Sequence, residues 1–346
     1  MYNLELERAV AFIEESKLED GAKVALQLPD GLVAHSGTII AELSSHFPQL
    51  RFIVIANTVY GACCIDDAAA VALNASVLIH FGHSELVPSS MLLLPVLYVR
   101  VTIAVDVPAI VQAISAFFPS DKPLALLSTA QYLSALADIH AALPWTTVPR
   151  TPGLSAGEML GCTVPPIPDG NVLVVCDGRF HLEAIGIAYP DATLYRFDPF
   201  NHKIYREEFE SGGLAPRVEM VERLRGRPLG KVGLLHGTLG RQGSLPLQRK
   251  LVNLIHRKGG EAVVVAMSLT DVDRVQGIAQ GLDLIVLLSC PRLAIDWGSQ
   301  FESVGVPVLT NMEFAALVDE GAWAEFSGKG YPLKNYSKKC NFGSAW

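Results

Sequence analysis

Short apolar segments alternate with segments of helical spacing along almost the whole chain. Residues 52–56 and 284–288 are apolar throughout, which is typical of parallel strands that are buried on both faces. Between such segments, stretches such as residues 38–47 and 246–258 repeat apolar side chains at the interval of an amphipathic helix. This alternation predicts an α/β fold with mainly parallel sheets.

The predicted elements fall into three cycles of similar length. Strands are expected at residues 23–28, 52–56, 77–80, 124–128, 172–176, 193–197, 232–236, 261–266 and 284–288, with an extended segment at 95–105. Helices are expected at residues 9–13, 38–47, 66–73, 107–118, 131–142, 180–188, 246–258 and 312–318. Breaks at 119–123 and 211–213 separate the cycles, so we predict three related α/β domains at residues 1–118, 119–220 and 221–346, the last with a C-terminal tail. Parallel sheets bind ligands beyond the carboxyl ends of their strands, so chemistry is expected in the residues that follow strands.

The acidic composition and the short apolar runs argue against two classes of partner. The chain has 27 Lys and Arg residues against 35 Asp and Glu, a formal net charge of −8, and it lacks the basic stripe of a nucleic-acid-binding surface. Its longest apolar run, residues 91–105, contains Pro95 and Arg100 and is shorter than the about 20 residues that span a bilayer. The N-terminus has no signal-peptide pattern, so we expect a cytoplasmic protein with reduced thiols and no direct contact with nucleic acid or membrane.

Three of the six cysteines occupy predicted loops, one in each predicted domain. Cys63 and Cys290 follow strands, and Cys162 lies in a Gly-containing stretch. No C-x-x-C pair is present, and a structural zinc ion would normally need four ligands at standard spacing. Three converging thiolates would suit an iron–sulfur cluster with one iron left open for a substrate. The alternative is that these cysteines pack in the core, as free cysteines often do, and the spacing leaves both interpretations open.

The other three cysteines are predicted to have structural or surface roles. Neighbouring residues of an extended chain point to opposite faces, so Cys64 is not expected to bind the same metal as Cys63. Cys176 ends an apolar strand and is expected in the core. Cys340 lies in the tail beside two lysines and is expected to be a solvent-side thiol, with a redox or regulatory role as the alternative.

Polar residues also follow other strands. The loop at 237–243 could present backbone N–H groups to an anionic ligand, but its G-x-x-G-x-x-G spacing matches neither the dinucleotide fingerprint nor the P-loop, so a plain tight turn is equally consistent. Asp177 and Arg179 could hold a polar ligand group, and Arg292 could clamp a carboxylate. His181 could serve a ligand or line the following helix.

Two further polar clusters carry weaker signals. His80 and His83 end a strand without a third ligand nearby, which is poor evidence for a single metal ion. Asp66 and Asp67 are predicted to begin a helix, where the helix dipole favours acids. No Ser-His-Asp set or paired-carboxylate signature is evident, so no acid–base catalyst is predicted.

Five motifs together resemble those of the diphthamide synthases, the 2-(3-amino-3-carboxypropyl)histidine synthases that begin diphthamide assembly on translation elongation factor 2. The motifs are YGACCIDD at 60–67, HFGHS at 80–84, DGRFHLE at 177–183, GTLGRQG at 237–243 and CPRLAIDW at 290–297. They occur in order, and the resemblance covers residues 24–332.

The resemblance implies an enzyme with a [4Fe-4S] cluster and three homologous α/β domains that each donate one cysteine. Carried over by motif, the ligands are Cys63, Cys162 and Cys290, with no catalytic side chain beyond the cluster. The implied reaction begins when the reduced cluster gives one electron to the sulfonium of S-adenosylmethionine (SAM) and the bond to the methionine γ-carbon breaks. The products are methylthioadenosine and a 3-amino-3-carboxypropyl radical, which attacks the imidazole C2 of a histidine in elongation factor 2.

The resemblance also implies several binding partners. Contacts to SAM are expected from residues that could hold its methionine carboxylate or another polar group: Arg292, Gly237, Thr238, Gly240, Gln242, Asp177 and Arg179. Protein partners would be elongation factor 2 as the substrate, an electron-donor protein, and either a second copy of the chain or a paralogous subunit.

Departures from the family pattern leave the ligand set intact. Glu85 stands where eukaryotic members often have a cysteine that is not a ligand, and the N-terminal extension usual in eukaryotic catalytic subunits is absent. All three ligand positions are kept, which favours a catalytic subunit over a non-catalytic scaffold subunit of the same complex. A nucleotide-binding α/β dehydrogenase that uses the loop at 237–243 is the remaining alternative, and its glycine spacing argues against it.

Overall fold

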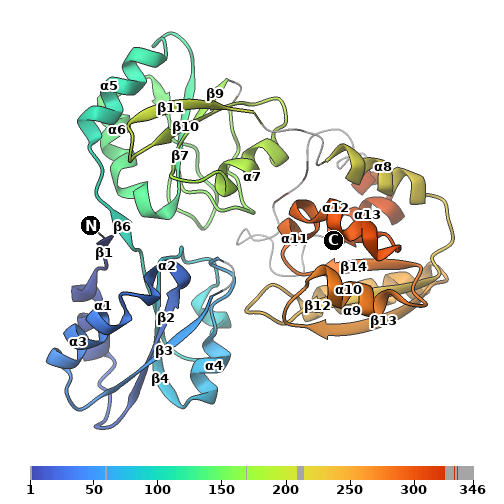
Figure 1. Ribbon diagram of the computed structural model, residues 1–346, viewed down its shortest axis with the longest axis horizontal. Coiled ribbons are helices and arrows are strands. Elements are labelled where there is room, and N and C mark those ends of the chain that lie inside the picture. The colour runs from blue at the N-terminus through green and yellow to red at the C-terminus, as the bar shows by residue number, and fades with distance from the viewer. Residues whose placement is uncertain are drawn as a thin grey trace.

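The computed structural model describes residues 2–58, 61–168, 170–208, 214–323, 331 and 333. The helices and strands form three α/β units, which are blue to cyan, green and orange to red in Figure 1. We refer to them as the first unit (residues 2–103), the second unit (107–208) and the third unit (214–323). The predicted break at 211–213 and the predicted surface thiol of Cys340 lie outside the described residues.

The first unit is a four-stranded parallel sheet with helices on both faces. In spatial order its strands are β3 (Arg51–Thr58), β2 (Lys23–Pro29), β4 (Ala75–Phe81) and β5 (Val96–Val99). Its helices are α1 (Leu6–Glu15), α2 (Asp30–Val33), α3 (Ser36–His46), α4 (Asp67–Ala72) and the 3-10 turn η1 (Ser89–Met91). Successive residues of a strand alternate between faces, so Val24 and Leu26 pack with α1 and α3 while Ala25 packs with α4.

The second unit has five strands, in the order β11 (Lys203–Glu207), β10 (Thr193–Asp198), β9 (Asn171–Val175), β7 (Leu124–Ser128) and β8 (Thr146–Thr147). Its helices are α5 (Val107–Phe117), the 3-10 helix η2 (Ala130–Ala135), α6 (Leu136–Ala142) and α7 (Phe180–Ala188). The short strands β1 (Tyr2–Asn3) and β6 (Thr102–Ile103) pair antiparallel where the chain passes from the first unit to the second. All five residues of β7 are buried, as expected for a strand covered on both faces.

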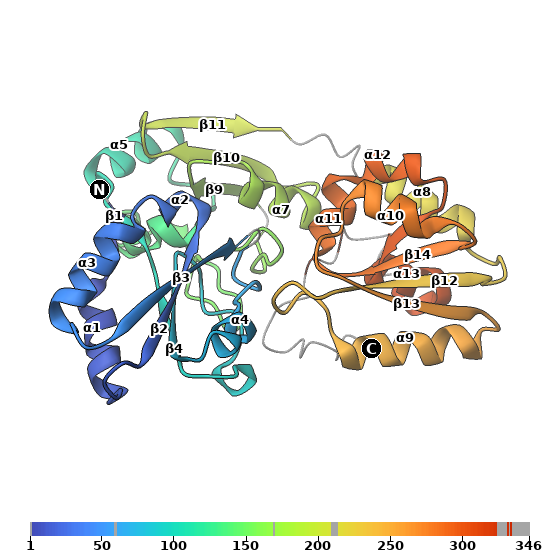
Figure 2. The same ribbon diagram turned by 60° about the horizontal axis from the view of Figure 1, so that its bottom comes forward.

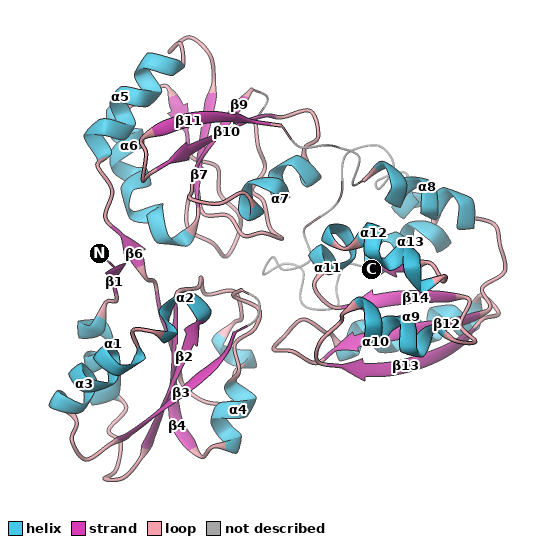
Figure 3. Ribbon diagram, viewed as in Figure 1, coloured by secondary structure: helices cyan, strands magenta, loops and turns pink. Residues whose placement is uncertain are grey.

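The third unit has the strands β13 (Glu261–Met267), β12 (Lys231–Gly237), β14 (Leu284–Leu288) and β15 (Val308–Thr310), all parallel. Its helices are α8 (Ala215–Leu224), α9 (Leu245–Arg257), α10 (Val272–Ala279), α11 (Pro291–Asp296), α12 (Gly298–Phe301), the 3-10 turn η4 (Glu302–Val304) and α13 (Asn311–Val318). In Figure 3 the arrowheads of β13 and β14 point toward the space between the three units. Within the described residues, no helix is long and apolar enough to cross a membrane.

The three sheets share one strand order. Counted along the chain within each unit, the first four strands lie in the order second, first, third, fourth, and every neighbouring pair among them is parallel in the first and third units. In the second unit, β10, β9, β7 and β8 are likewise parallel neighbours, and β11 is added antiparallel to β10 at the edge. The predicted α/β class with mainly parallel sheets is therefore confirmed.

Both predicted internal boundaries need to move toward the N-terminus. The division at 118/119 follows α5, but Ile110 and Ile114 of α5 pack with Leu124 in the core of the second unit. The division at 220/221 falls inside α8, which packs against α13 of the third unit. In both cases the predicted boundary follows or interrupts a helix that belongs by packing to the next unit.

Several elements differ from their predicted form. The extended segment at 95–105 is split between β5 and β6, which belong to different sheets. The helix predicted at 131–142 begins as the 3-10 helix η2 and becomes α-helical at Leu136. Strands β11 and β15 and helices α8, α10 and α11 were not predicted, because they are short or carry charged residues that hide their apolar period.

The second and third units share a hydrophobic core. One continuous cluster of buried side chains includes Val174 and Leu182 of the second unit and Val232 and Phe314 of the third. Figures 1 and 2 both show α7 of the second unit beside α11 of the third. This packing brings the carboxyl ends of β9 and β14 to the same side of the molecule.

Candidate functional site

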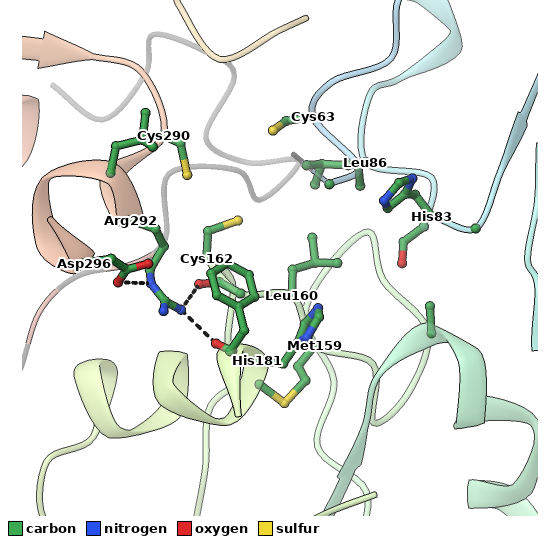
Figure 4. Close-up of a pocket in the computed structure, with 18 of the residues that line it drawn as sticks. Cys63, His83, Leu86, Met159, Leu160, Cys162, His181, Cys290, Arg292 and Asp296 are labelled. Carbon is green, nitrogen blue, oxygen red and sulfur yellow. Dashed lines mark hydrogen bonds and ion pairs between the residues drawn. The ribbon is translucent and has the colours of Figure 1, made fainter. Parts of the chain in front are cut away.

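A cavity of about 530 Å³ lies where the three units meet. The first unit lines it with residues that follow β3 and β4, the second with residues 159–162 and the start of α7, and the third with residues of α11. Most of these lining segments follow a strand, as expected for ligand sites of parallel α/β sheets. The close-up in Figure 4 looks into this cavity.

The cavity brings together the three cysteines that the sequence singled out. Cys63, Cys162 and Cys290 all line it, and Figure 4 draws them around one space, each from a different unit. All three are free thiols, of which Cys63 is buried and the other two are half-buried. A thiol from each unit therefore faces the same cavity.

A tight turn sets the position of Cys63. The Cys64 N–H donates to the Gly61 carbonyl at 2.9 Å, and the Asp66 side chain caps α4 by accepting from Ala69 N–H at 3.0 Å. Because the chain turns here, the sulfurs of Cys63 and Cys64 lie 3.7 Å apart. The prediction that they point to opposite faces is wrong, since it assumed an extended chain.

The other two cysteines are held by different local structures. Cys162 lies in a short loop in which the N–H of Leu160 donates to the Thr163 carbonyl at 3.0 Å. Cys290 comes two residues after β14 and directly precedes α11, whose first residue is Pro291. Proline suits the first position of a helix, where its missing N–H costs nothing.

Burial and mutual proximity raise the pKa of each thiol. The pKa of Cys63 lies well above its usual value because of its hydrogen bond with Cys64, its burial and the neighbouring thiols of Cys290 and Cys162. Burial raises the pKa of Cys162 to about 12, with a further contribution from Cys290. Burial also raises the pKa of Cys290 to about 11, against the opposing effect of Arg292. Without a bound metal, the three thiols are therefore protonated at neutral pH.

Arg292 ties the second unit to the third. Its side chain is 3% exposed; Nε donates to Asp296 at 2.7 Å and Nη2 to Glu183 at 2.8 Å. Nη1 donates to the backbone carbonyls of Gly161 at 3.0 Å and Phe180 at 2.8 Å. The guanidinium also lies 4.1 Å from the centre of the Phe180 ring.

These contacts change the interpretation of Arg292. Arg292 lines the cavity, but most of its N–H groups already donate to protein acceptors. The structure therefore shows Arg292 as a contact between two units, whereas the sequence predicted that it would bind the carboxylate of a ligand. Gly161 adjoins Cys162, and Arg292 itself lies two residues after Cys290. One guanidinium therefore fixes the distance between two of the three cysteine loops.

Arg241 ties the third unit to the first. Its backbone N–H donates to the Cys63 carbonyl at 2.8 Å, and its Nη2 donates to Asp67 at 2.6 Å and to the Met91 carbonyl at 3.2 Å. Asp67 is fully buried and also accepts from the backbone N–H of Leu93 at 2.9 Å, while its Oδ1 has no partner among the described residues. Asp67, which the sequence predicted as an acid at the start of a helix, thus also forms a contact between two units.

The neighbours of Arg241 in the loop at 237–243 pack on the same turn. Gly240 has a φ of +54°, and a Cβ atom there would lie 2.5 Å from the Cys63 carbonyl oxygen and from the Cys64 Cα. Gln242 donates from Nε2 to the Cys64 sulfur at 3.4 Å. Glycine is required at position 240 both for its backbone conformation and for this close approach.

A third contact ties the first unit to the second. The Ser84 hydroxyl donates to Glu158, which is fully buried and also accepts from the backbone N–H of Ser155 at 2.8 Å. Arg100 lies 3.9 Å from the same carboxylate. Each pair of units is therefore joined by a charged residue.

The three charged contacts all lie close to the cysteines in the sequence. Asp67 is four residues after Cys63, Glu158 is four residues before Cys162, and Arg292 is two residues after Cys290. Docking of the units and placement of the thiols therefore depend on the same loops. Arg241 and Ser84 lie within two of the family motifs, but no local signal assigned them or Glu158 to contacts between units, because their partners are far away along the chain.

The other residues predicted to contact SAM do not line this cavity among the described residues; they are Asp177, Arg179, Gly237, Thr238, Gly240 and Gln242. The loop at 237–243 packs against the Cys63 turn, so it does not open as an N–H cradle. Arg179 pairs with Glu207 at 3.3 Å, and Asp177 accepts from Gln131 at 3.3 Å. Direct SAM contacts by these residues remain a prediction.

Two histidines also line the cavity. Burial is the main cause that lowers the pKa of both His83 and His181 to about 4, so both rings are neutral at neutral pH. His181 lies in the first turn of α7 and lines the cavity. The sequence left open whether His181 serves a ligand or lines the helix, and its position in the structure is one from which a ligand could be reached. Cys176 is fully buried in the core, as predicted.

The donor set fits an iron–sulfur cluster better than a single metal ion. Among the described residues, no group of three or more His, Cys, Asp and Glu side chains is arranged to hold one metal ion. Thiolates that share one tetrahedral ion lie about 3.8 Å apart, given metal–sulfur bonds of about 2.3 Å. In a cluster each thiolate binds a different iron, so three wider-spaced thiols around one cavity are the expected arrangement.

Known proteins resemble this chain over most of its length. Residues 28–327 match the family described as "Putative diphthamide synthesis protein". The chain belongs to this diphthamide synthesis family. Relatives named 2-(3-amino-3-carboxypropyl)histidine synthase subunit 1 from Schizosaccharomyces pombe and Homo sapiens are 37% and 35% identical to it, over 97% of this chain and 77% and 75% of theirs. The resemblance inferred from the sequence motifs is thus confirmed. The curated relatives carry the enzyme name that this resemblance implied.

A solved structure shares the fold of this diphthamide-family chain. Dph2 from Pyrococcus horikoshii with a 4Fe-4S cluster matches with a TM-score of 0.73 at 20% identity, over 92% of this chain and 91% of that one. A second structure of the same protein matches with a TM-score of 0.74. The three-unit arrangement is therefore a fold that this chain shares with Dph2.

Proposed function

We propose that this chain is the catalytic subunit of a 2-(3-amino-3-carboxypropyl)histidine synthase, which transfers a 3-amino-3-carboxypropyl group from SAM to the imidazole C2 of a histidine in translation elongation factor 2. The observation that carries this proposal is the convergence of Cys63, Cys162 and Cys290 on one cavity. The curated relatives that carry this enzyme's name support it, with 35–37% identity over nearly the whole chain. Retention of all three thiols favours a catalytic subunit over a scaffold subunit.

The three thiols are the proposed ligands of a [4Fe-4S] cluster. When bound and reduced, such a cluster supplies one electron to the sulfonium of SAM, which breaks the bond to the methionine γ-carbon. Three cysteines for four irons leave one coordination position for SAM. Arg292 and Arg241 hold the loops that carry these cysteines, so their role in this proposal is to set the spacing of the ligands.

The remaining walls of the cavity suit this chemistry. Leu86, Met159 and Leu160 are apolar and would keep water away from reactive groups. His83 and His181 are neutral because burial lowers the pKa of both. Neutral rings add no positive charge that would oppose the binding of a sulfonium.

Other proteins complete the proposed reaction. The curated relatives are named as subunit 1, so we propose that this chain works with a paralogous subunit or with a second copy of itself. Elongation factor 2 supplies the target histidine, and a separate electron-donor protein supplies the reducing electron.

Cluster loading tests the ligand set directly. Anaerobic reconstitution with iron and sulfide should give the wild-type chain a full complement of iron and visible absorption. Cys63→Ala, Cys162→Ala and Cys290→Ala should each lose most of both signals. Cys176→Ala is the matched control, because Cys176 is a buried core cysteine that does not line the cavity, and it should retain both signals. Wild-type iron content in all three ligand variants would refute the ligand assignment.

A further inference from the structure

A buried chain of hydrogen bonds runs from the Cys63 turn to the wall of the cavity. It begins at Gln27, which is fully buried in β2. The Gln27 amide donates from Nε2 to the Cys64 carbonyl at 2.8 Å, and its Oε1 accepts from the Asp66 N–H at 3.0 Å. These two contacts fix which end of the amide is oxygen, because a carbonyl can only accept and a backbone N–H can only donate.

The orientation of Gln27 fixes the tautomer of His80. Its Nδ1 lies 2.7 Å from Gln27 Oε1, which can only accept, so Nδ1 must carry the proton. His80 is fully buried, and burial lowers its pKa well below the usual value, so the ring is neutral and holds a single N–H. The Nε2 atom of His80 therefore has a free lone pair.

His80 in turn fixes the tautomer of His83. His80 Nε2 lies 3.1 Å from His83 Nδ1. Because this Nε2 can only accept, the Nδ1 of His83 must donate, and the neutral His83 ring then keeps an unprotonated Nε2. His83 is half-buried and lines the cavity, and Nε2 is the ring nitrogen that the contact with His80 leaves unused.

The position of His83 in the fold matches that of a proposed cluster ligand. His83 comes two residues after β4, the third strand of the first unit's parallel sheet, and Cys290 comes two residues after β14, the third strand of the third unit. The two units have the same strand order. Equivalent positions in the first and third units therefore place an imidazole (His83) and a thiol (Cys290) at the same cavity.

We propose that His83 Nε2 is a preset hydrogen-bond acceptor for a nitrogen-bound proton of the ligand in this cavity, and that Gln27 and His80 are positioning residues that hold it in this tautomer. This inference rests on the proposed function for the identity of the ligand. The nitrogen donors available there are the α-ammonium group and the adenine amino group of SAM, and the imidazole N–H of the target histidine. All three present an N–H donor to His83.

The tautomer is tested independently of any activity. Nitrogen-15 shifts of the histidine rings in the labelled full chain, with the His83 signal assigned by its loss in His83→Gln, should report Nδ1–H and bare Nε2 for both His80 and His83. The Nε2–H form is the commoner one for a free imidazole in water, so this result is not expected by default. An Nε2–H tautomer at His83 would overturn the inference.

The acceptor role is tested with a matched pair of variants. His83→Asn keeps a polar group near Nδ1 and removes the acceptor, whereas His83→Gln keeps an oxygen near Nε2. In the reconstituted chain, His83→Asn should weaken SAM binding or raise the KM for elongation factor 2 by about 10- to 100-fold, the effect of one hydrogen bond to a charged or buried group. His83→Gln should have a clearly smaller effect, and the iron content of both should equal that of the wild type.

The outcomes separate the inference from the proposed function. A change in SAM affinity identifies SAM as the source of the donor, and a change confined to the KM identifies the target imidazole. If both constants stay within about twofold of the wild type in His83→Asn, the acceptor role is wrong, because one lost hydrogen bond should exceed that. If iron content falls in parallel with affinity, His83 has only a structural role, which also overturns the inference. A wild-type chain that carries its cluster and does not cleave SAM would instead refute the proposed function, while the tautomer measurement would still decide the inference.

Discussion

Arg292 and Arg241 both reach from the third unit to a cysteine-bearing loop of another unit, but their surroundings differ. Arg292 is 3% exposed and meets two carboxylates, two backbone carbonyls and an aromatic ring. Arg241 is 22% exposed and meets one buried carboxylate and the Met91 carbonyl. One oxygen of that carboxylate has no partner among the described residues. The second and third units also share a continuous hydrophobic core.

This difference indicates that the second and third units are held together more rigidly at the cavity than the first and third units are. A guanidinium with most of its donors paired, next to a shared core, holds Cys162 and Cys290 at a fixed separation. The Cys63 turn depends on the Arg241 pair, the close contact at Gly240 and the hydrogen bond from Gln242. We therefore expect Cys63 to be the thiol most easily displaced.

Removal of Arg292 should have the largest effect. Arg292→Met leaves two backbone carbonyls without a donor and removes the partner of two carboxylates that are about one-third exposed. The free energy of unfolding should fall by about 3–5 kcal/mol, because each buried carbonyl left without a donor costs about 1–3 kcal/mol. Chemical denaturation of the full chain measures this change. Arg292→Lys should recover little, since an ammonium cannot reproduce the planar set of donors. A loss below about 1 kcal/mol for Arg292→Met would mean that the shared core alone joins the two units.

Removal of Arg241 should cost less. Arg241→Met leaves Asp67 with only the Leu93 N–H, and the loss of a hydrogen bond to a charged group predicts about 1.5–3 kcal/mol. The double variant with Asp67→Asn should recover part of this loss, because the unpaired buried charge is then gone. Simple additivity of the two substitutions would show that Arg241 and Asp67 are not coupled.

A methyl group at Gly240 should displace Cys63, and its effect on stability beyond backbone strain should be similar to that of removing Arg241. Gly226 also has a positive φ, and a Cβ atom added there would meet nothing within 4 Å, so Gly226→Ala measures the strain alone at about 1–2 kcal/mol. Gly240→Ala should cost about 1–3 kcal/mol more through overpacking. Iron content after reconstitution should fall in Gly240→Ala and stay normal in Gly226→Ala. Equal iron content in both would show that the close approach at Gly240 does not position Cys63.

The elements that could be predicted from sequence are those whose apolar pattern is local. Residues 124–128 and 284–288 coincide with β7 and β14, because strands buried on both faces leave an uninterrupted apolar run. The antiparallel edge strand β11 (KIYRE) is rich in charge, and α8 (APRVEMVERL) also interrupts its apolar residues with charged ones, so neither has a clear apolar period. The missed elements therefore lie where one face is open to solvent or the segment is short.

The site was predictable as a set of residues but not as a geometry. Cys63, Cys162 and Cys290 were singled out by their loop positions and by the family resemblance, and all three line the cavity. The roles of Arg292 and the loop at 237–243 were not, because their partners lie more than a hundred residues away in sequence. Nothing in the local pattern distinguishes an arginine that clamps a ligand from one that clamps a neighbouring unit.

The most direct test of the proposed function is the product formed from SAM by the anaerobically reconstituted chain in the presence of dithionite. We expect methylthioadenosine from the wild type and none from Cys290→Ala, since cleavage at the γ-carbon depends on a cluster held by the three thiols. Formation of 5′-deoxyadenosine would contradict the proposed cleavage. Absence of any SAM cleavage by a chain with a loaded, reduced cluster would contradict the catalytic assignment and indicate the scaffold subunit instead.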